Sequence, residues 1–155
     1  MSRFTARVES SQALAASTSF ANLVAGASAG LKLRRIQVGI RNTTGTPTSQ
    51  QLSLAIFRAT ARGTATTTVT GIQMDPNSAA SAITGLDTAW SANPTIAANP
   101  IWEQSFNSQL PLDIPWELLE ELVVASGTTN GLAFQFLGNA LPSSHLATLT
   151  CEWEE

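Results

Sequence analysis

The residues of this chain that could do acid–base chemistry are its carboxylates and its single histidine, His145. Glu120 and Glu121 are adjacent, as are Glu154 and Glu155, and neighbours on a strand point to opposite faces of a sheet. A glycoside hydrolase needs two carboxylates at a set separation across a cleft. His145 has neither a GxSxG motif nor a second histidine beside it. We therefore expect solvated strand ends, a loop histidine and no enzyme.

Metal and cofactor chemistry has little support in the sequence. Cys151 is the only cysteine, which excludes a disulfide framework and a cysteine-based metal site.

The first ten residues, MSRFTARVES, lack the apolar stretch of a signal peptide. Residues 12–30 are rich in alanine but are interrupted by Ser, Thr and Asn, which makes them too polar to span a membrane. We expect no metal, no cofactor and no membrane partner.

Charge is distributed unevenly along the chain. All eight basic residues lie within the first 62 positions, which carry a net charge of +7, whereas the remaining residues carry −10. Such asymmetry is found in nucleic-acid-binding proteins. It also fits two halves that neutralise each other within one fold, or a subunit face that meets the opposite charge on its neighbour. Charged residues make up only 12% of the chain, about half the usual share, so we expect partner subunits to cover much of the surface. The alternative is solvation by Thr and Ser hydroxyls.

Five arginines of the basic half are candidates for contacts with the acidic surface of a partner. Phosphate contacts are the alternative, but proteins that bind single-stranded nucleic acid interleave aromatic residues with basic ones. The arginine-rich segments carry only Phe57, so we expect no nucleic acid and favour salt bridges within or between subunits. The five candidates are Arg34, Arg35, Arg41, Arg58 and Arg62.

Three tryptophans of the acidic half are candidate anchors of the core or of an interface. They are Trp90, Trp102 and Trp116. Tryptophan buries a large apolar area and is enriched at protein interfaces. The alternative is a platform on which pyranose rings stack, but the chain has no tyrosine to extend it, and we favour anchors.

Apolar residues alternate with polar ones along most of the chain, which predicts strands. About eight strands separated by turn signals indicate one all-β domain over residues 1–155, a sandwich of jelly-roll-like form. The clearest strands are expected at 3–9, 31–41, 52–57, 64–70, 101–107, 132–137 and 147–154, with a weaker one within 13–24 and one at 117–125. The Asp75-Pro76 pair permits at most one short helix near 76–82, since Asp caps helices and Pro fits their first position. Residues 83–100 are expected to form a loop.

Two local patterns add detail. In Leu31–Arg41 the apolar parity reverses at Arg34-Arg35, which predicts a β-bulge, because one extra residue moves every later side chain to the opposite face. Leu52–Pro76 reads as a hairpin: an alternating strand, a turn at Thr60–Gly63 and a threonine-rich return strand. The charge of the chain changes sign at this turn.

From residue 31 onward the chain resembles a family of small virion proteins of tailed bacteriophages. The matching features are the strand LRRIQVG at 33–39, Arg58-Ala59-Thr60, Gly63-Thr64 with its threonine run, Asp75-Pro76 with Ser78-Ala79-Ala80, Trp90 with Pro94-Thr95, and the final Glu154-Glu155. The sequence departs from the family pattern at Met74 and in the acidic, leucine-rich segment Leu118–Leu122.

The resemblance implies a capsid decoration, or cement, protein that binds the major capsid protein on the outer capsid surface. Such proteins often form trimers, so a homotrimer or another closed oligomer is expected, made in the host cytoplasm. A tail or head-fibre component is the first alternative, and a carbohydrate-binding adsorption module is the second.

Overall fold

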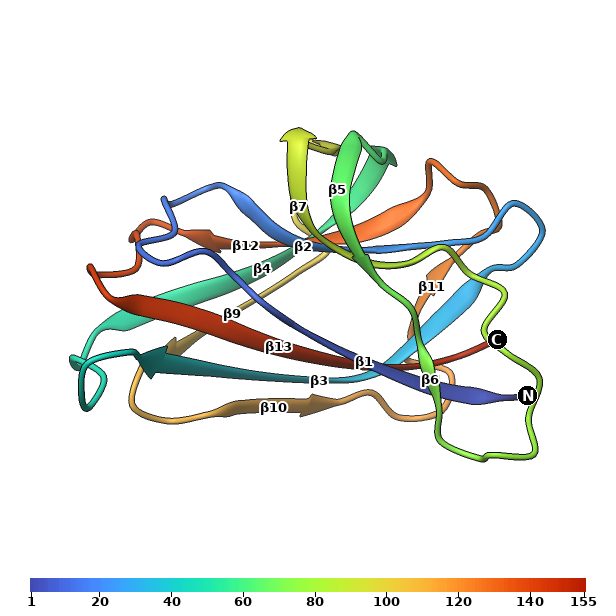
Figure 1. The fold of residues 1–155 in the computed structure, drawn as a ribbon, viewed down its shortest axis with the longest axis horizontal. Helices are drawn as coiled ribbons and strands as arrows, with labels where there is room; N and C mark the ends of the chain where they lie inside the picture. The colour runs from blue at the N-terminus through green and yellow to red at the C-terminus, as the bar shows by residue number, and fades with distance from the viewer.

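The computed structural model describes all residues 1–155, and its regular structure consists of strands in two antiparallel sheets that pack face to face (Figure 1). Sheet A has six strands: β1 (Arg3–Glu9), β3 (Leu31–Asn42), β6 (Ile72–Gln73), β10 (Leu112–Pro115), β11 (Leu122–Val124) and β13 (His145–Glu154). Sheet B has seven: β2 (Ser19–Val24), β4 (Gln51–Ala61), β5 (Thr64–Val69), β7 (Gly85–Ala92), β8 (Thr95–Ile96), β9 (Trp102–Asn107) and β12 (Gly131–Leu137). The prediction of an all-β sandwich is confirmed.

The main strands pair as a nested series of antiparallel ladders. β4 pairs with β9, β3 with β10 and β11, β2 with β12, and β1 with β13, so each ladder encloses the previous one in sequence. These ladders give the strand orders β10-β3-β13-β1 in sheet A and β2-β12-β4-β9 in sheet B. Eight strand positions folded over in this way into two four-stranded sheets form a jelly roll.

Residues 62–101 are an insertion between β4 and β9. Within it, β5 and β7 pair with each other and extend sheet B beyond β2, whereas β6 pairs with β1 at the edge of sheet A. Figure 1 shows β5 and β7 projecting above the sandwich, while β6 passes beside the N-terminus. The insertion therefore contributes strands to both sheets.

The β-bulge predicted in β3 is present at Arg34. Arg35 lies opposite Glu152 and Leu33 lies opposite Trp153, so Arg34 is the extra residue in the ladder between β3 and β13. Apolar residues on both sides of the bulge face the core, as the reversed parity requires. The buried residues of β3 are Leu31, Leu33, Ile36 and Val38.

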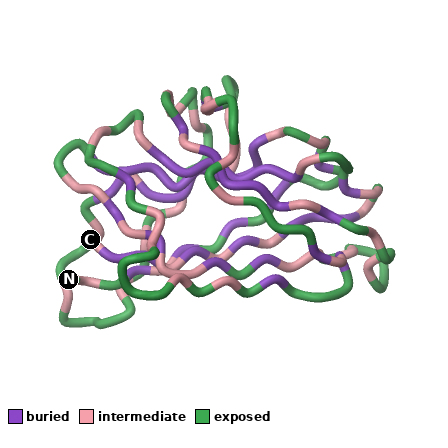
Figure 2. Tube along the Cα trace, turned by 180° about the vertical axis from the view of Figure 1, so that it is seen from behind, coloured by how far each residue is buried: buried purple, intermediate pink, exposed green.

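Aromatic side chains from both sheets fill the space between them. Trp153 on β13 is fully buried, and its ring stacks on Phe4 with centroids 6.0 Å apart. Phe20 and Phe136 stack in the same way within sheet B, at 5.0 Å. Gly71 lies against the Trp153 indole, where a Cβ would overlap the ring. Figure 2 shows the buried residues concentrated along the strands and the exposed ones in the connections.

The hairpin expected within Leu52–Pro76 is wrong. β4 and β5 are both strands, but β5 pairs with β7, because β8 and β9 occupy the free edge of β4. The loop expected at 83–100 is also wrong in its first half, which forms β7. Gly85, Pro94 and Pro100 favoured a loop, but a strand forms between them, and its Asp87 side chain is fully buried and binds Arg62.

No helix forms at 76–82. Asp75 Oδ1 accepts a hydrogen bond from the Asn77 N–H at 2.9 Å, which closes a turn instead of capping a helix. Beyond the turn, the Glu155 carboxylate binds the Ala82 N–H at 2.7 Å and the Ser81 hydroxyl at 2.6 Å. The Ala82 N–H, which a helix would use for its own backbone hydrogen bond, is thus bound by Glu155, a residue distant in sequence.

The strand expected at 117–125 is confined to Leu122–Val124, since residues 117–121 form a turn.

The expectation of a loop histidine is wrong as well. His145 begins β13 and is buried, where Nε2 accepts a hydrogen bond from the Thr48 N–H at 2.9 Å. Nδ1 lies 2.9 Å from the Ser143 carbonyl oxygen and donates to it. The imidazole therefore links the connection between β3 and β4 to the turn that precedes β13.

Replacing Trp153 by alanine should lower the free energy of unfolding by about 3–5 kcal/mol, because the change removes the largest fully buried side chain and leaves a cavity. Chemical denaturation monitored by circular dichroism measures the difference. Leu110→Ala is the control, since Leu110 is exposed and its loss should change stability by less than about 0.5 kcal/mol. Equal effects of the two changes would contradict this assignment of the core.

Candidate functional site

Ion pairs gather on the outer face of sheet A. Seven of the eight salt bridges lie there, and they join side chains that alternate with the buried residues of β1, β3, β10 and β13, together with Glu121 from the neighbouring turn. We call this surface the charged face. Its arginines come from the basic part of the sequence and most of its acids from the acidic part, so the antiparallel ladders bring the two charges together.

Arg34, the bulge residue, is the centre of these ion pairs. Its guanidinium binds Glu121 and lies 2.7 Å from Glu154 Oε2, while Arg3 Nε lies 3.2 Å from the other oxygen of Glu154. The Arg34 side chain is only 11% exposed. The hydrogen bond from Arg34 lowers the pKa of Glu154 and raises the pKa of Arg34 itself. In Glu121, backbone N–H groups lower the pKa first, and Arg34 lowers it further.

Arg35 forms a second centre on the other side of the bulge. Its Nε and terminal nitrogen lie 2.7 and 2.5 Å from the two oxygens of Asp113 on β10, a two-pronged contact with charge-assisted hydrogen bonds. This contact holds the pKa of Asp113 below its ordinary value. Glu152 lies 3.9 Å away and adds a weaker attraction.

The other three predicted arginines lie apart from this centre and from one another. Arg41 is exposed and lies 3.2 Å from Glu9. Arg58 on β4 donates to the main-chain carbonyl of Val123 in β11, and so connects the two sheets. Arg62 binds both oxygens of the buried Asp87, at 2.7 and 2.8 Å. Each of the five arginines thus has an acceptor within its own chain, and their contacts with a partner stay a prediction.

The three predicted tryptophans do not form one platform. Trp102 and Trp116 meet edge to face with centroids 5.9 Å apart, and both pack against the core from its rim. Trp90 lies elsewhere, on β7, and its indole N–H is buried without a hydrogen-bond partner. The first two therefore act as core anchors, and the third stands alone.

Groups that could support catalysis or metal binding are dispersed. Cys151 is fully buried, and burial raises the pKa of its thiol. No three His, Cys, Asp or Glu side chains come together in a way that could hold a metal ion. The structure has no helix that is long and apolar enough to cross a membrane.

Exposed apolar side chains flank the charged face at both edges of sheet A. Ile72 and Met74 lie along β6 at one edge, and Val123 lies on β11 at the other. One row of paired residues crosses sheet A and connects these two edges. Along this row Val123 lies opposite Lys32, Lys32 opposite Glu154, and Glu154 opposite Arg3. The Arg3 carbonyl then accepts the Met74 N–H at the far edge. We call these three residues, together with Leu118 and Leu119, the apolar rim.

Leu118 and Leu119 are the most unusual members of the apolar rim. They occupy the turn that Glu121 ties to Arg34, and they are 69% and 89% exposed. Leu119 has a φ of 75°, a left-handed conformation that is unfavourable for a residue with a Cβ. Both leucines lie within the strand expected at 117–125, and their exposure was not predicted. The sequence ELLEEL at 117–122 could have indicated this exposure, because its first two leucines are flanked by acids and do not follow the alternating pattern of a strand.

No protein-family model matches this sequence, and no curated protein is significantly similar to it. Among solved structures, the chain is similar to a chain in the structure of a marine algae virus of the order Picornavirales. The TM-score is 0.37 and the identity 6%, over 100% of this chain and 69% of that chain.

The charged face predicts a loss of stability in acid. Folding lowers the pKa of Glu154 and Asp113 below their ordinary values of 4.5 and 3.8, so their contribution is present above those values and is lost as the pH falls through the lowered ones. Thermal melting between pH 7 and pH 2 should show the midpoint decreasing below about pH 4.5. Glu154→Gln should melt lower at pH 7 and should depend less on pH, whereas Glu117→Gln, at an exposed position without an ion pair, should behave as wild type. A wild-type midpoint that stays constant down to pH 2 would contradict this account.

Proposed function

We propose that this chain is a virion structural protein, a capsid decoration (cement) protein that binds the major capsid protein on the outer capsid surface. The observation that carries the proposal is the apolar rim around a charged face whose ions are paired within the chain. Its support from the fold is the jelly roll, an architecture that viral capsid domains use among other proteins. The sequence resemblance to small phage virion proteins points in the same direction.

Leu118 and Leu119 are the central contacts in this proposal. Single exposed leucines are ordinary on protein surfaces, but two in succession on one turn, one of them strained, lower both solubility and stability. A partner surface that covers them offsets both costs. Glu117 and Glu120 flank the pair without ion-pair partners of their own, so the complementary surface on the partner is apolar with a basic border.

Binding in this way needs no chemical step. A stable protein interface buries about 1,600 Å² in total, and a closed oligomer such as a trimer presents the apolar rim several times to a repeating lattice. Modest contacts at each subunit then add up to firm attachment that stabilises the shell. In this proposal the protein is made in the host cytoplasm, joins the outside of the capsid and has no catalytic role.

Replacing Leu118 by serine and Leu119 by glycine should abolish binding to undecorated capsids while leaving the fold intact. Glycine accepts a φ of 75° without strain, so the melting temperature of the variant should equal or exceed that of wild type. Co-sedimentation with capsids measures the binding. Leu110→Ser removes another exposed leucine, close in exposure to Leu118, and serves as the matched control. Wild-type binding by the double variant would overturn the assignment of this surface.

Arg35 and Arg41 test the predicted contribution of the arginines to the interface. Both are partly exposed, and the double change to glutamine leaves the Arg34 centre in place. Capsid binding should weaken and should become less sensitive to salt, because two charges leave the interface. Unchanged affinity and salt dependence would confine these arginines to a role within the chain.

Electron microscopy of purified particles distinguishes the proposal from a role in the tail or in a head fibre. Density for this chain on the faces of the capsid supports a decoration protein, and density only at the tail or at fibre bases excludes it. Light scattering after size exclusion gives the oligomeric state. A monomer at high concentration would contradict the closed oligomer.

A further inference from the structure

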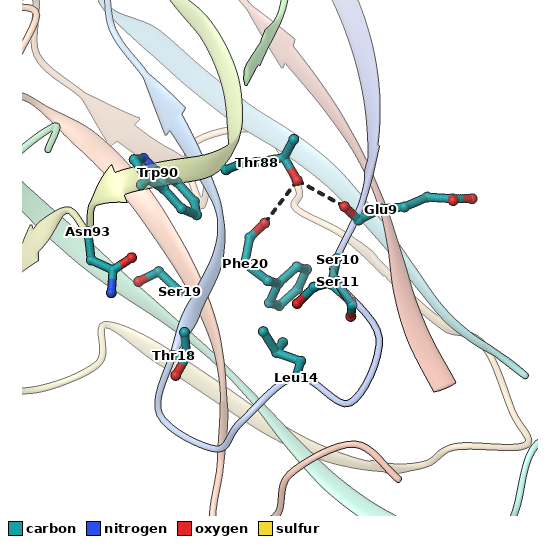
Figure 3. Close-up of a pocket in the computed structure, with 11 residues that line it drawn as sticks. Glu9, Ser10, Ser11, Leu14, Thr18, Ser19, Phe20, Thr88, Trp90 and Asn93 are labelled. Carbon is teal, nitrogen blue, oxygen red and sulfur yellow. Dashed lines mark hydrogen bonds between the residues drawn. The ribbon is translucent and has the colours of Figure 1, made fainter. Parts of the chain in front are cut away.

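A pocket of about 400 Å³ lies between the segment that follows β1 and the strand β7 (Figure 3). This volume is within the range of small-molecule sites, roughly 300–1,000 Å³. In Figure 3, Trp90 and Asn93 lie on one side, Ser10 and Ser11 on the other, and Phe20 between them. The pocket is separate from the apolar rim and plays no part in the proposed capsid contact.

Part of the polar lining is fixed by hydrogen bonds within the chain. The Thr88 hydroxyl donates to the Glu9 carbonyl at 2.9 Å and lies 3.3 Å from the Phe20 carbonyl. The Ser10 hydroxyl lies 2.8 Å from the Ser11 carbonyl and accepts the Ala147 N–H at 2.9 Å. The Ser19 hydroxyl accepts from Gln135 Nε2 at 3.0 Å. These groups form a rigid frame.

The remaining polar side chains of the lining have no partner within the chain. Ser11 and Thr18 each offer a hydroxyl, which donates once and accepts twice, and Asn93 offers an amide that donates and accepts. Trp90 is half-buried, and its indole N–H is itself covered by the chain, so it presents its ring rather than a donor to the pocket. The pocket therefore combines a fixed frame with several free donors and acceptors.

The pocket is uncharged and has an apolar base. Glu9 is its one ionisable lining residue, and the Glu9 carboxylate points away from the pocket in Figure 3. That carboxylate lies 2.8 Å from an Arg7 nitrogen and 3.2 Å from an Arg41 nitrogen. The half-buried ring of Trp90 supplies apolar surface, and the buried side chains of Leu14 and Phe20 close the base behind it. A charged ligand would meet no free opposite charge here.

The wall of the pocket is held in a strained conformation. Ala13 and Ser17 have φ values of 50° and 57°, so two of the four non-glycine residues with positive φ lie in this one segment. The Ala13 N–H donates to the His145 carbonyl at 3.0 Å, and the Ser17 N–H to the Phe136 carbonyl at 2.7 Å. Strain that the surrounding structure maintains in this way is common in binding sites, because it positions the lining before the ligand arrives.

We propose that this pocket binds one neutral sugar unit, a hexopyranose at the end of a glycan or within it. A pyranose ring has an apolar face of C–H groups and a border of hydroxyls that both donate and accept. The half-buried ring of Trp90 matches the first feature, and the free side chains of Ser11, Thr18 and Asn93 match the second. Binding of this kind is compatible with the proposed role on the capsid surface and does not depend on it.

Nuclear magnetic resonance with the intact protein tests the proposal. The probes are the methyl glycosides of glucose, galactose, mannose and N-acetylglucosamine, each titrated at millimolar concentration. At least one should shift the Trp90 indole resonance and show saturation transfer from the protein, while the indole resonances of Trp102 and Trp153 stay in place.

Variants separate binding at this pocket from binding elsewhere. Thr18→Val with Asn93→Ala should weaken the affinity for the glycoside about tenfold or more, through the lost hydrogen bonds, at an unchanged melting temperature. Thr66→Val with Asn77→Ala is the matched control, since both residues are exposed outside the pocket. Capsid binding should be the same in both double variants, so this test is independent of the proposed function.

Three results would overturn the proposal. They are a panel in which no glycoside shifts Trp90, wild-type affinity in the Thr18→Val, Asn93→Ala variant, and preferential binding of a sialylated or sulfated sugar over all neutral ones.

Discussion

The pairing of β3 with β13 is the interaction on which the other features of this molecule depend. β13 lies between β1 and β3 in the middle of sheet A, so its residues form ladders on both sides. One face of β13 buries Trp153 in the core, and the other presents Glu152 and Glu154 to arginines. The bulge at Arg34 lets both halves of β3 follow this arrangement. Core packing and surface charge are therefore set by a single register.

The same pairing of β3 with β13 determines which parts of the surface of sheet A are charged and which are apolar. Because the acids and bases of sheet A pair with one another, a charged partner can reach only those that stay partly exposed, such as Arg35 and Arg41. The exposed apolar parts of sheet A lie at its edges, on β6, β11 and the turn at 117–121. A chain with so few charged residues uses most of them for its own fold. Because most charged residues pair within the chain, the surface has few free charges and the ion pairs are nevertheless well formed.

Local sequence patterns were sufficient for the sandwich, for most strands and for the bulge, because alternation of apolar residues reports directly on a buried face. They were insufficient where a distant residue decides the outcome. The glycine and prolines of 83–100 favoured a loop, but β7 forms there, with its buried Asp87 paired to the distant Arg62. Asp75-Pro76 begins a turn and not a helix, and Glu155 binds the residues that follow it. The role of the candidate arginines and tryptophans at an interface stays a prediction. Their contacts within the chain, the exposure of Leu119 and the pocket could not be predicted, because they depend on segments that are distant in sequence.

The nested order of the ladders has a consequence for biosynthesis. The pair β4–β9 encloses 40 intervening residues, and each further ladder spans a longer stretch until β1 meets β13. β1 precedes the other strands of the sandwich, yet it has no partner in sheet A until the two-residue β6 emerges, and its main partner, β13, emerges last. Closing such long loops is slow, and unpaired strands are prone to aggregate meanwhile. This domain thus remains open until β13 has emerged, and its yield in a cell depends on protection during that interval.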